Sequence, residues 1–374
     1  MRPVPVNTPA LFAEERSAVL QCLDEGWISS EGPHVAQFEV LFAETFGRAH
    51  GVAVSSGTAG LDIAVRALGL SPGDEVLVPS LTIISCASAI VNSGARPVPV
   101  DCDPSDWNSH LQHFQARITP RTRAIMLVHL YGLCADLAPL LAWARERGLA
   151  VIEDASEAHG LDYARSPCGS FGDISVFSLY ANKVVTTGEG GMILCNDSAL
   201  AQRCRSLRNL CFIPERRFWH EELGWNYRLT AMQAALGIPQ LRRLPELVRR
   251  KRAIGRAYHE AFRAMPQFQV APAATPYCEN VWWVFGIVIS AGAGFSRADI
   301  VAALGALGIG TRPFFHGLHE QPALLLQGMA AVSLPVTEAL SAAGFYLPSG
   351  LGLTDEDQYR VIGAVRDFVE ARTR

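Results

Sequence analysis

The stretch HGVAVSSGTAGLDIAVRALGLSPGDEVLVPS, residues 50–80, decides the fold class, because it holds a strand, a helix and a second strand in that order. Residues 50–56 form a short apolar run that ends in two serines. Apolar residues then recur at helical spacing through residues 58–70, and a turn at residues 71–74 leads into another apolar run. Two apolar strands joined through a helix are typical of a parallel sheet that is buried on both faces.

The same alternation of strands and helices continues along the chain. Further strands are predicted at residues 96–103, 123–132 and 149–156, and helices at residues 82–94 and 137–148. This rhythm predicts an α/β fold with a mainly parallel sheet.

A second, smaller domain is predicted after the parallel sheet. A long, basic, amphipathic helix with a proline near its start is expected at residues 241–265, followed by a strand at 281–290 and helices at 296–308 and 355–372. We therefore divide the chain into a large domain, residues 1–240, which includes the N-terminal segment, and a smaller C-terminal α+β domain, residues 241–374.

The composition argues against several classes of protein. The chain has 374 residues, of which 49% are hydrophobic and 18% charged, and its net charge of −4 gives no support to nucleic-acid binding. No run approaches the roughly 18 apolar residues of a membrane span, and the N-terminus lacks the apolar stretch of a secretory signal. The nine cysteines are scattered without zinc spacing, so we expect reduced core thiols, no metal site and a cytoplasmic protein.

The use of lysine is the first pointer to chemistry. Of the 32 lysine and arginine residues, only Lys183 and Lys251 are lysines. Arginine stays protonated, whereas a desolvated lysine can lose its proton and attack a carbonyl carbon to form a Schiff base. Lys183, in the apolar, glycine-flanked stretch SLYANKVVTTGEGGM (residues 178–192), is therefore a candidate nucleophile, although a composition that favours arginine could leave two lysines by accident.

Three segments place polar groups where strands end, which is where open α/β sheets bind ligands. Ser55–Thr58 closes a strand and opens a helix, so it is either a phosphate cradle or an ordinary helix cap. Asp154 is either a turn residue or the partner of a cationic ring nitrogen. Ser178 and Lys183 follow a third strand. A phosphate cradle, a carboxylate for a pyridinium nitrogen and a Schiff-base lysine together indicate pyridoxal phosphate.

With these motifs the chain resembles, nearly end to end, the DegT/DnrJ/EryC1/StrS family of sugar aminotransferases. The resemblance is carried by GWISSEGPHVAQFE, SSGTAGLDIAV, VIEDASEAHG, FGDISVFSLYANKVVTTGEGGMI, GWNYRLTAMQAALG and TRPFFHGLHEQPAL. It implies an aspartate-aminotransferase-like fold (fold type I), pyridoxal 5′-phosphate as cofactor, and a homodimer with shared active sites. Among the members, the chain is most similar to those that aminate GDP-4-keto-6-deoxymannose with L-glutamate.

The resemblance also implies roles for individual residues. Lys183 would form the Schiff base and move the proton, and Asp154 would pair with the pyridine nitrogen. The cofactor would be held by Gly57, Thr58, Asp154, Glu157, Ser178, Lys183 and, reaching the phosphate of the other subunit, Asn226. The substrate would contact Ser29, Arg228, Arg312 and His319.

Two positions depart from the family pattern. Ile83 stands where relatives usually carry an aromatic residue stacked on the pyridine ring, and Gly317 stands where they often carry proline. An aliphatic side chain still packs on the ring but loses a stacking contact worth about 1 kcal/mol.

The sequence leaves alternatives open. Another nucleotide-linked ketosugar, a C3 ketone or a cyclitol ketone would suit the same scaffold, and the loops at residues 26–32, 212–220 and 314–321 are expected to decide between them. A sugar dehydratase of this family would carry histidine in place of Lys183, and a cofactor-binding regulator would need a fused or partner signalling element.

Overall fold

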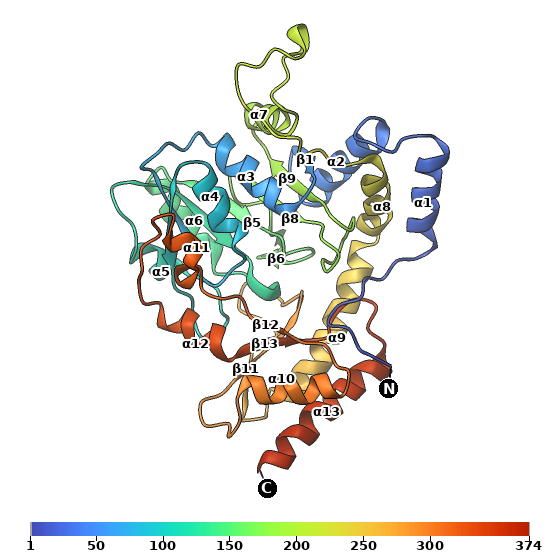
Figure 1. Ribbon diagram of the computed structural model, residues 1–374, viewed down its shortest axis with the longest axis vertical. Coiled ribbons are helices and arrows are strands. Elements are labelled where there is room, and N and C mark those ends of the chain that lie inside the picture. Colours follow the sequence, from blue (N-terminus) through green and yellow to red (C-terminus); the bar gives the residue numbers. More distant parts are fainter. Residues whose placement is uncertain (1, 374) are drawn as a thin grey trace.

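The computed structural model describes residues 2–373 and confirms the α/β fold with a seven-stranded sheet at its centre (Figure 1). Only β9 runs antiparallel to both of its neighbours, and all other pairs are parallel. The strands lie in the order β1 (His50–Val54), β9 (Gly191–Cys195), β8 (Ile174–Ser178), β5 (Ala150–Asp154), β4 (Thr122–Val128), β2 (Glu75–Pro79) and β3 (Arg96–Val100).

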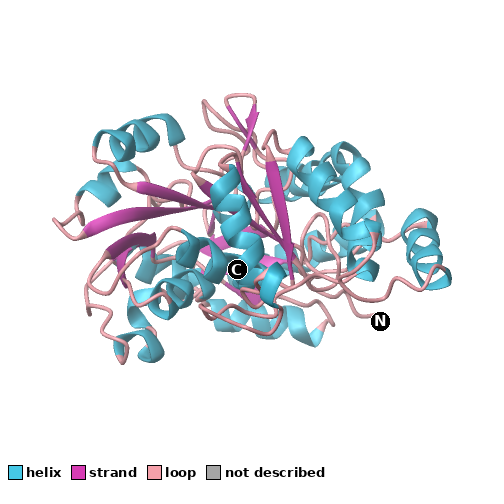
Figure 2. Ribbon diagram, turned by 90° about the horizontal axis from the view of Figure 1, so that it is seen from above, coloured by secondary structure: helices cyan, strands magenta, loops and turns pink. Residues whose placement is uncertain are grey.

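Helices cover both faces of this sheet (Figure 2). Side chains alternate along each strand, so Val52 and Val54 face one layer and Ala53 faces the other. The first layer contains α3 (Gly57–Ala67), α4 (Ser85–Asn92) and α7 (Ser198–Arg208). The second contains α2 (Pro33–Thr45), α6 (Leu137–Glu146) and α8 (Ala231–Arg242), with α1 (Ala13–Asp24) packed on α8.

A smaller antiparallel sheet has a hydrophobic core of its own. Its strands lie in the order β10 (Phe268–Val270), β11 (Phe285–Ile289), β13 (Gly344–Leu347) and β12 (Arg312–Pro313). Helices α9 (Leu244–Phe262), α10 (Arg297–Ala306) and α13 (Asp355–Thr373) contribute to the core. The proposed division after residue 240 falls in the last turn of α8 and stays a prediction.

The basic helix predicted at residues 241–265 is instead two helices that meet at Arg243. Pro245 lies in the first turn of α9, where its missing N–H costs nothing, whereas in one continuous helix it could not donate to the carbonyl of Leu241. Thr230 and Gln233 form a capping box that begins α8.

Short elements complete the chain. They are α5 (Leu111–Gln115), α11 (Pro322–Leu325), α12 (Pro335–Ala343), the hairpin of β6 (Asp162–Tyr163) and β7 (Ser166–Pro167), and the 3₁₀ turns η1 (Leu130–Gly132), η2 (Pro214–Arg216) and η3 (Leu318–Glu320).

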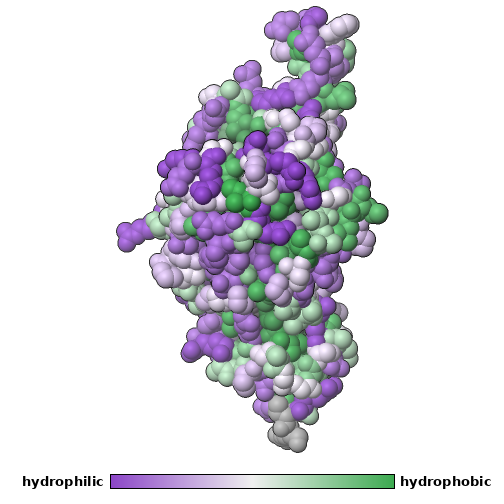
Figure 3. Space-filling view, turned by 90° about the vertical axis from the view of Figure 1, so that its left-hand side faces the viewer, coloured by the Kyte–Doolittle hydropathy of each residue, from purple (hydrophilic) through white to green (hydrophobic). Residues whose placement is uncertain are grey.

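The segment that follows α7 projects from the body of the molecule (Figure 1). Phe218 and Trp219 on this segment are 76% and 60% exposed, and their neighbours in the sequence are mostly charged. The projecting segment is mainly hydrophilic at its surface (Figure 3). The nine cysteines, all of which lie within the described residues, are buried free thiols. Between residues 2 and 373 no helix is long and apolar enough to cross a membrane.

Candidate active site

Many of the predicted site residues line one cavity of about 320 Å³ at the carboxyl ends of β5 and β8. Its wall includes Gly57, Thr58, Ile83, Asp154, Glu157, Ser178, Lys183, Trp283, Arg312, Phe315 and Tyr346. Arg312 and Tyr346 belong to strands of the smaller sheet, so the cavity lies between the two sheets.

One end of the cavity is the N-terminus of α3. Ser56 caps this helix, since its Oγ accepts the amide of Ala59 at 3.0 Å. A Cβ on Gly57 would come within 2.9 Å of the Ser178 Cβ, so glycine allows α3 and the end of β8 to approach closely. Backbone amides of a first helical turn and the hydroxyls of Thr58 and Ser178 form a suitable site for a phosphate.

Asp154 ends β5 and is 2% exposed. Its Oδ1 accepts the amide of Ser156 at 3.0 Å, and its Oδ2 accepts the thiol of Cys86 at 3.2 Å. Burial, followed by the charge of Asp154, raises the pKa of Cys86, which keeps that thiol a neutral donor. Asp154 therefore both shapes the turn and presents a buried carboxylate to the cavity, where a bound cation would stabilise it.

Lys183 lies in the segment between β8 and β9, and it lines the cavity. Its Nζ is 3.7 Å from the centre of the Trp283 ring and 3.9 Å from Oε1 of Glu157. Burial lowers the pKa of Lys183, and the charges of Glu157 and Asp154 oppose part of this effect. A lowered pKa makes the neutral, nucleophilic amine more available near neutral pH.

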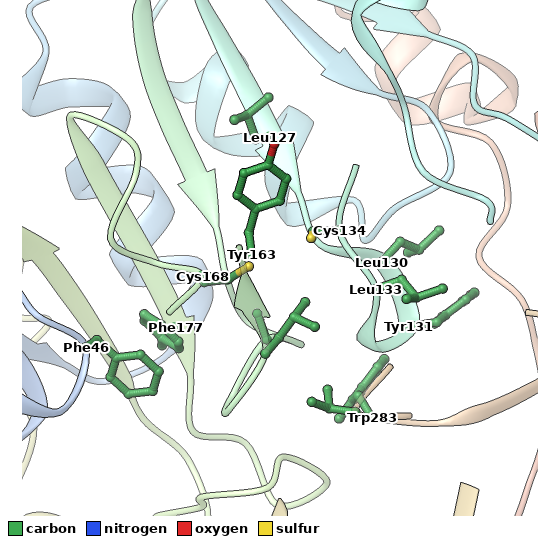
Figure 4. Packing of buried hydrophobic residues seen from close by; sticks show 14 of the residues in the cluster. Phe46, Leu127, Leu130, Tyr131, Leu133, Cys134, Tyr163, Cys168, Phe177 and Trp283 are labelled. Atoms are coloured by element: carbon green, nitrogen blue, oxygen red, sulfur yellow. The ribbon is translucent and has the colours of Figure 1, made fainter. Parts of the chain in front are cut away.

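Glu157 is held in place by Tyr131, whose backbone amide donates to Oε2 at 2.7 Å. Burial raises the pKa of Glu157, against the opposing effect of the Lys183 ammonium. Tyr131 has a φ of 55°, a left-handed conformation that is strained for a bulky side chain and is typical of functional sites. Its ring stacks on Trp283 with 6.3 Å between centroids (Figure 4) and on Phe315 with 5.6 Å between centroids.

Sequence reasoning did not identify Tyr131 or Trp283 as parts of this site. Trp283 lies in the apolar run VWWVFGIVIS, which indicates only a core strand, and it reaches Lys183 through the packing of the two sheets. Tyr131 acts through its backbone amide, which any residue could supply. Neither residue leaves a local signal in the sequence.

Three other predicted residues gather elsewhere in the chain. Ser29 and Arg228 line a second cavity of about 530 Å³. Asn226 forms an isolated bridge with Asn209, whose Oδ1 accepts a hydrogen bond from Arg228 at 2.7 Å. The structure of one chain does not bring these residues into the wall of the Lys183 cavity.

His319 is buried and lines neither of the two cavities. Its Nδ1 lies 2.7 Å from the Ser80 hydroxyl, and its Nε2 lies 3.3 Å from Oε1 of Glu338. These contacts tie η3 to the end of β2 and to α12, and a role in substrate binding stays a prediction.

His129 is the satisfied buried histidine that its apolar surroundings predict, since its Nε2 lies 2.8 Å from Oε1 of Glu153. His129, Cys134 and Cys168 also bring potential ligand atoms within 4.8 Å of one another in the core. The two sulfur atoms are visible in Figure 4.

Pyridoxal phosphate fits the residues of the Lys183 cavity. The glycine-lined helix end suits its phosphate, the buried carboxylate of Asp154 suits its protonated ring nitrogen, and Lys183 supplies an amine for its aldehyde. Ile83 lines the same wall and is 42% exposed, so an aliphatic side chain does occupy the cavity where an aromatic residue is usual.

Comparison with known proteins identifies close relatives over nearly the whole chain. The model of the DegT/DnrJ/EryC1/StrS aminotransferase family matches residues 9–366. The chain is 42% identical over 363 residues to the GDP-perosamine synthase of Caulobacter vibrioides, covering 97% of each chain. It is 37% identical to the GDP-perosamine synthase of Escherichia coli O157:H7, covering 98% of this chain and 99% of that one.

A solved structure agrees with the fold described above. The aminotransferase TlmJ from Streptoalloteichus hindustanus is similar to this chain with a TM-score of 0.93 at 32% identity, covering 99% of this chain and 100% of that chain.

Proposed function

This chain belongs to the DegT/DnrJ/EryC1/StrS aminotransferase family, and we propose that it transfers an amino group from L-glutamate to C4 of a GDP-linked 4-keto-6-deoxyhexose. As a member of that family it is a pyridoxal-phosphate-dependent sugar aminotransferase. The choice of GDP-4-keto-6-deoxymannose rests on the similarity to two GDP-perosamine synthases, at 42% and 37% identity.

The observation that carries the proposal is the meeting of Lys183 with Asp154 and the α3 helix end in one cavity. When bound there, pyridoxal phosphate supplies an electron sink for the carbon that gains or loses a proton. Lys183 provides the amine that attaches the cofactor, and after its release the same amine accepts and donates the transferred proton. Asp154 keeps the ring nitrogen protonated, while Gly57 and Ser178 hold the phosphate.

The cavity wall favours this chemistry by limiting the access of water. Trp283 covers Lys183 from the side of the smaller sheet, and the carboxyl group of Glu157 lies 3.9 Å from the Lys183 Nζ. Arg312 supplies a fixed positive charge for the acidic amino donor or for the diphosphate of the sugar nucleotide.

We further propose a homodimer in which each active site is built from both chains. Within one chain, Ser29, Arg228 and Asn226 lie around the second cavity, apart from Lys183. A two-fold axis would bring the second cavity of one protomer to the first cavity of its partner. The exposed aromatic rings of the projecting segment support this arrangement, because such rings are enriched in interfaces.

The free thiols of the chain fit a reducing, cytoplasmic location.

A panel of nucleotide-linked ketosugars tests the function directly. The purified protein, loaded with pyridoxal phosphate and L-glutamate, is incubated with GDP-, UDP- and dTDP-linked 4-ketosugars and with a C3 ketone, and each product is measured by mass spectrometry. We expect amination of the GDP-linked 4-ketosugar with the highest kcat/KM. Preference for another nucleotide would overturn the substrate assignment, and full activity of Lys183→Ala would overturn the role of the lysine.

A further inference from the structure

Both lysines of the chain lie at the same place in the fold. Lys251, on α9, is 3% exposed, and it lines a cavity of about 10 Å³ together with Lys183 and Asn182. The position of Lys251, directly behind the segment that carries Lys183, therefore calls for a physical account.

Lys251 fixes the residue that covers Lys183. Its Nζ donates a hydrogen bond to the carbonyl oxygen of Trp283 at 2.8 Å and another to the carbonyl oxygen of Ser349. The Trp283 ring lies under the Nζ of Lys183, with 3.7 Å between the nitrogen and the ring centre. Lys251 thus holds the backbone of Trp283, whose side chain contacts the reactive amine.

Trp283 also restrains the backbone next to Lys183. Its indole Nε1 donates to the carbonyl oxygen of Asn182 at 3.0 Å. The same segment is tied to α8, because Gln240 accepts the amide of Thr186 at 3.0 Å and donates to its carbonyl at 2.7 Å. Residues 180–187 are therefore anchored from the side of the smaller sheet and from α8.

In the small cavity, one N–H donor of Lys251 and the side-chain oxygen of Asn182 have no hydrogen-bond partner among the described residues. An ammonium group has three N–H donors, and two of those of Lys251 reach the carbonyls of Trp283 and Ser349. In the part of the chain that the structure describes, Oδ1 of Asn182 is buried without a hydrogen-bond partner. A volume of about 10 Å³ corresponds to one trapped water molecule, which would join the third donor to this acceptor.

We propose that Lys251 is a positioning residue for Lys183, which acts by holding Trp283 against the reactive amine and by binding Asn182 through one buried water. Its effect on turnover rests on the proposed function of Lys183, whereas its restraint of residues 180–187 does not. Arginine at position 251 has donors enough to hold the same carbonyls, while an apolar side chain of similar length has none.

Because Lys251 is buried, water cannot replace its hydrogen bonds to the carbonyl groups of Trp283 and Ser349. Desolvation lowers the pKa of Lys251 to about 7, so the third donor is present mainly below pH 7, whereas the neutral amine keeps two donors for the carbonyls of Trp283 and Ser349. A buried amine whose bonds go to backbone carbonyls leaves those carbonyls unsatisfied when it is removed, and unsatisfied buried groups loosen the segment that carries them.

The test compares Lys251→Met and Lys251→Arg with Tyr258→Phe in the cofactor-loaded protein. Tyr258 is a matched control, because it is buried on the same helix and its hydroxyl donates a hydrogen bond to the carbonyl oxygen of Pro348 at 2.8 Å. Hydrogen–deuterium exchange is measured in peptides that cover residues 180–187, and circular dichroism is measured in the visible band of the bound cofactor, which reports its orientation.

We expect Lys251→Met to speed exchange in residues 180–187 by about tenfold relative to Tyr258→Phe, to reduce the visible circular dichroism and to lower kcat with little change in KM. Lys251→Arg should restore all three. Wild-type exchange and dichroism in Lys251→Met, or equal changes in Tyr258→Phe, would overturn the proposal. If Lys251→Met does not fold, Lys251→Gln, which has too few donors to make all three contacts, is judged by the same measurements.

The outcomes separate this proposal from the proposed function. If Lys183 does not attach the cofactor, the wild-type protein shows no visible band, yet the exchange measurement still reports whether Lys251 restrains residues 180–187. If the band is present and exchange does not respond, Lys251 is not a positioning residue while the function of Lys183 stands.

Discussion

The charge of Glu157 raises the proton affinity of Lys183, and Glu157→Gln removes that charge while preserving the shape of the side chain. The carboxylate Oε1 lies 3.9 Å from Nζ. At an effective dielectric constant of about 20, this separation corresponds to an attraction of about 4 kcal/mol. That value is an upper limit, because burial raises the pKa of Glu157 and the carboxyl group then carries less than its full charge near neutral pH. We therefore expect the pKa of Lys183 to fall by about 1–3 units in the variant.

The assay follows attachment of the cofactor to Lys183 as a function of pH. Pyridoxal phosphate is added to the cofactor-free protein, and the rate at which visible absorption appears is measured from mildly acidic to alkaline pH. Only the neutral amine reacts, so a lower pKa of Lys183 moves the midpoint of this profile to lower pH in Glu157→Gln. Glu221→Gln, which changes an exposed carboxylate paired with Arg216, controls for a general change in charge. An unchanged midpoint, or one moved to higher pH, would refute the reasoning.

Three further predictions concern the same site. Asp154→Asn should keep the cofactor bound but slow turnover at least about a thousandfold, because the ring nitrogen loses its proton; single-turnover rates with saturating glutamate check this, and a near-normal rate would leave Asp154 as a turn residue only. Gly57→Ala should weaken cofactor binding by about tenfold or more, since the new Cβ would lie 2.9 Å from the Ser178 Cβ, and equilibrium dialysis measures the change. Mixing Lys183→Ala with Asn226→Ala should restore up to about a quarter of wild-type activity, because half of the exchanged dimers then carry one intact site; confirmed exchange without recovery would contradict the shared site.

The strand ends of the active site could be predicted from the sequence. Ser55–Thr58, Asp154 and Ser178 each follow an apolar run, and the carboxyl ends of parallel strands meet at one edge of a sheet. Their roles in catalysis stay predictions, and the structure places Ser56–Thr58, Asp154 and Ser178 in the wall of one cavity with Lys183.

The other side of the active site could not be predicted, because it depends on how the two sheets pack. Trp283 and Tyr346 come from late in the chain, and no periodic pattern reports which of their neighbours they will face, while Arg312 is expected here only from the family resemblance. The amphipathic pattern at residues 241–265 predicts a single helix, but the helix is interrupted at Arg243, because Pro245 cannot donate the backbone hydrogen bond that a continuous helix needs. Tyr131 shows a third limit, since a contact made by a backbone amide leaves no trace in residue type.

The spread of the cavity wall along the chain, from Ser56 to Tyr346, makes cofactor supply a determinant of protein abundance. No unfolded or partly synthesised chain can present this set of groups together, so pyridoxal phosphate should bind the native state far more tightly than the unfolded chain. At a free concentration about one hundred times its dissociation constant, such a ligand adds about 2.7 kcal/mol to the stability of the fold. A cell that is starved of vitamin B6 should therefore contain less of this protein, through faster degradation, as well as less of its activity.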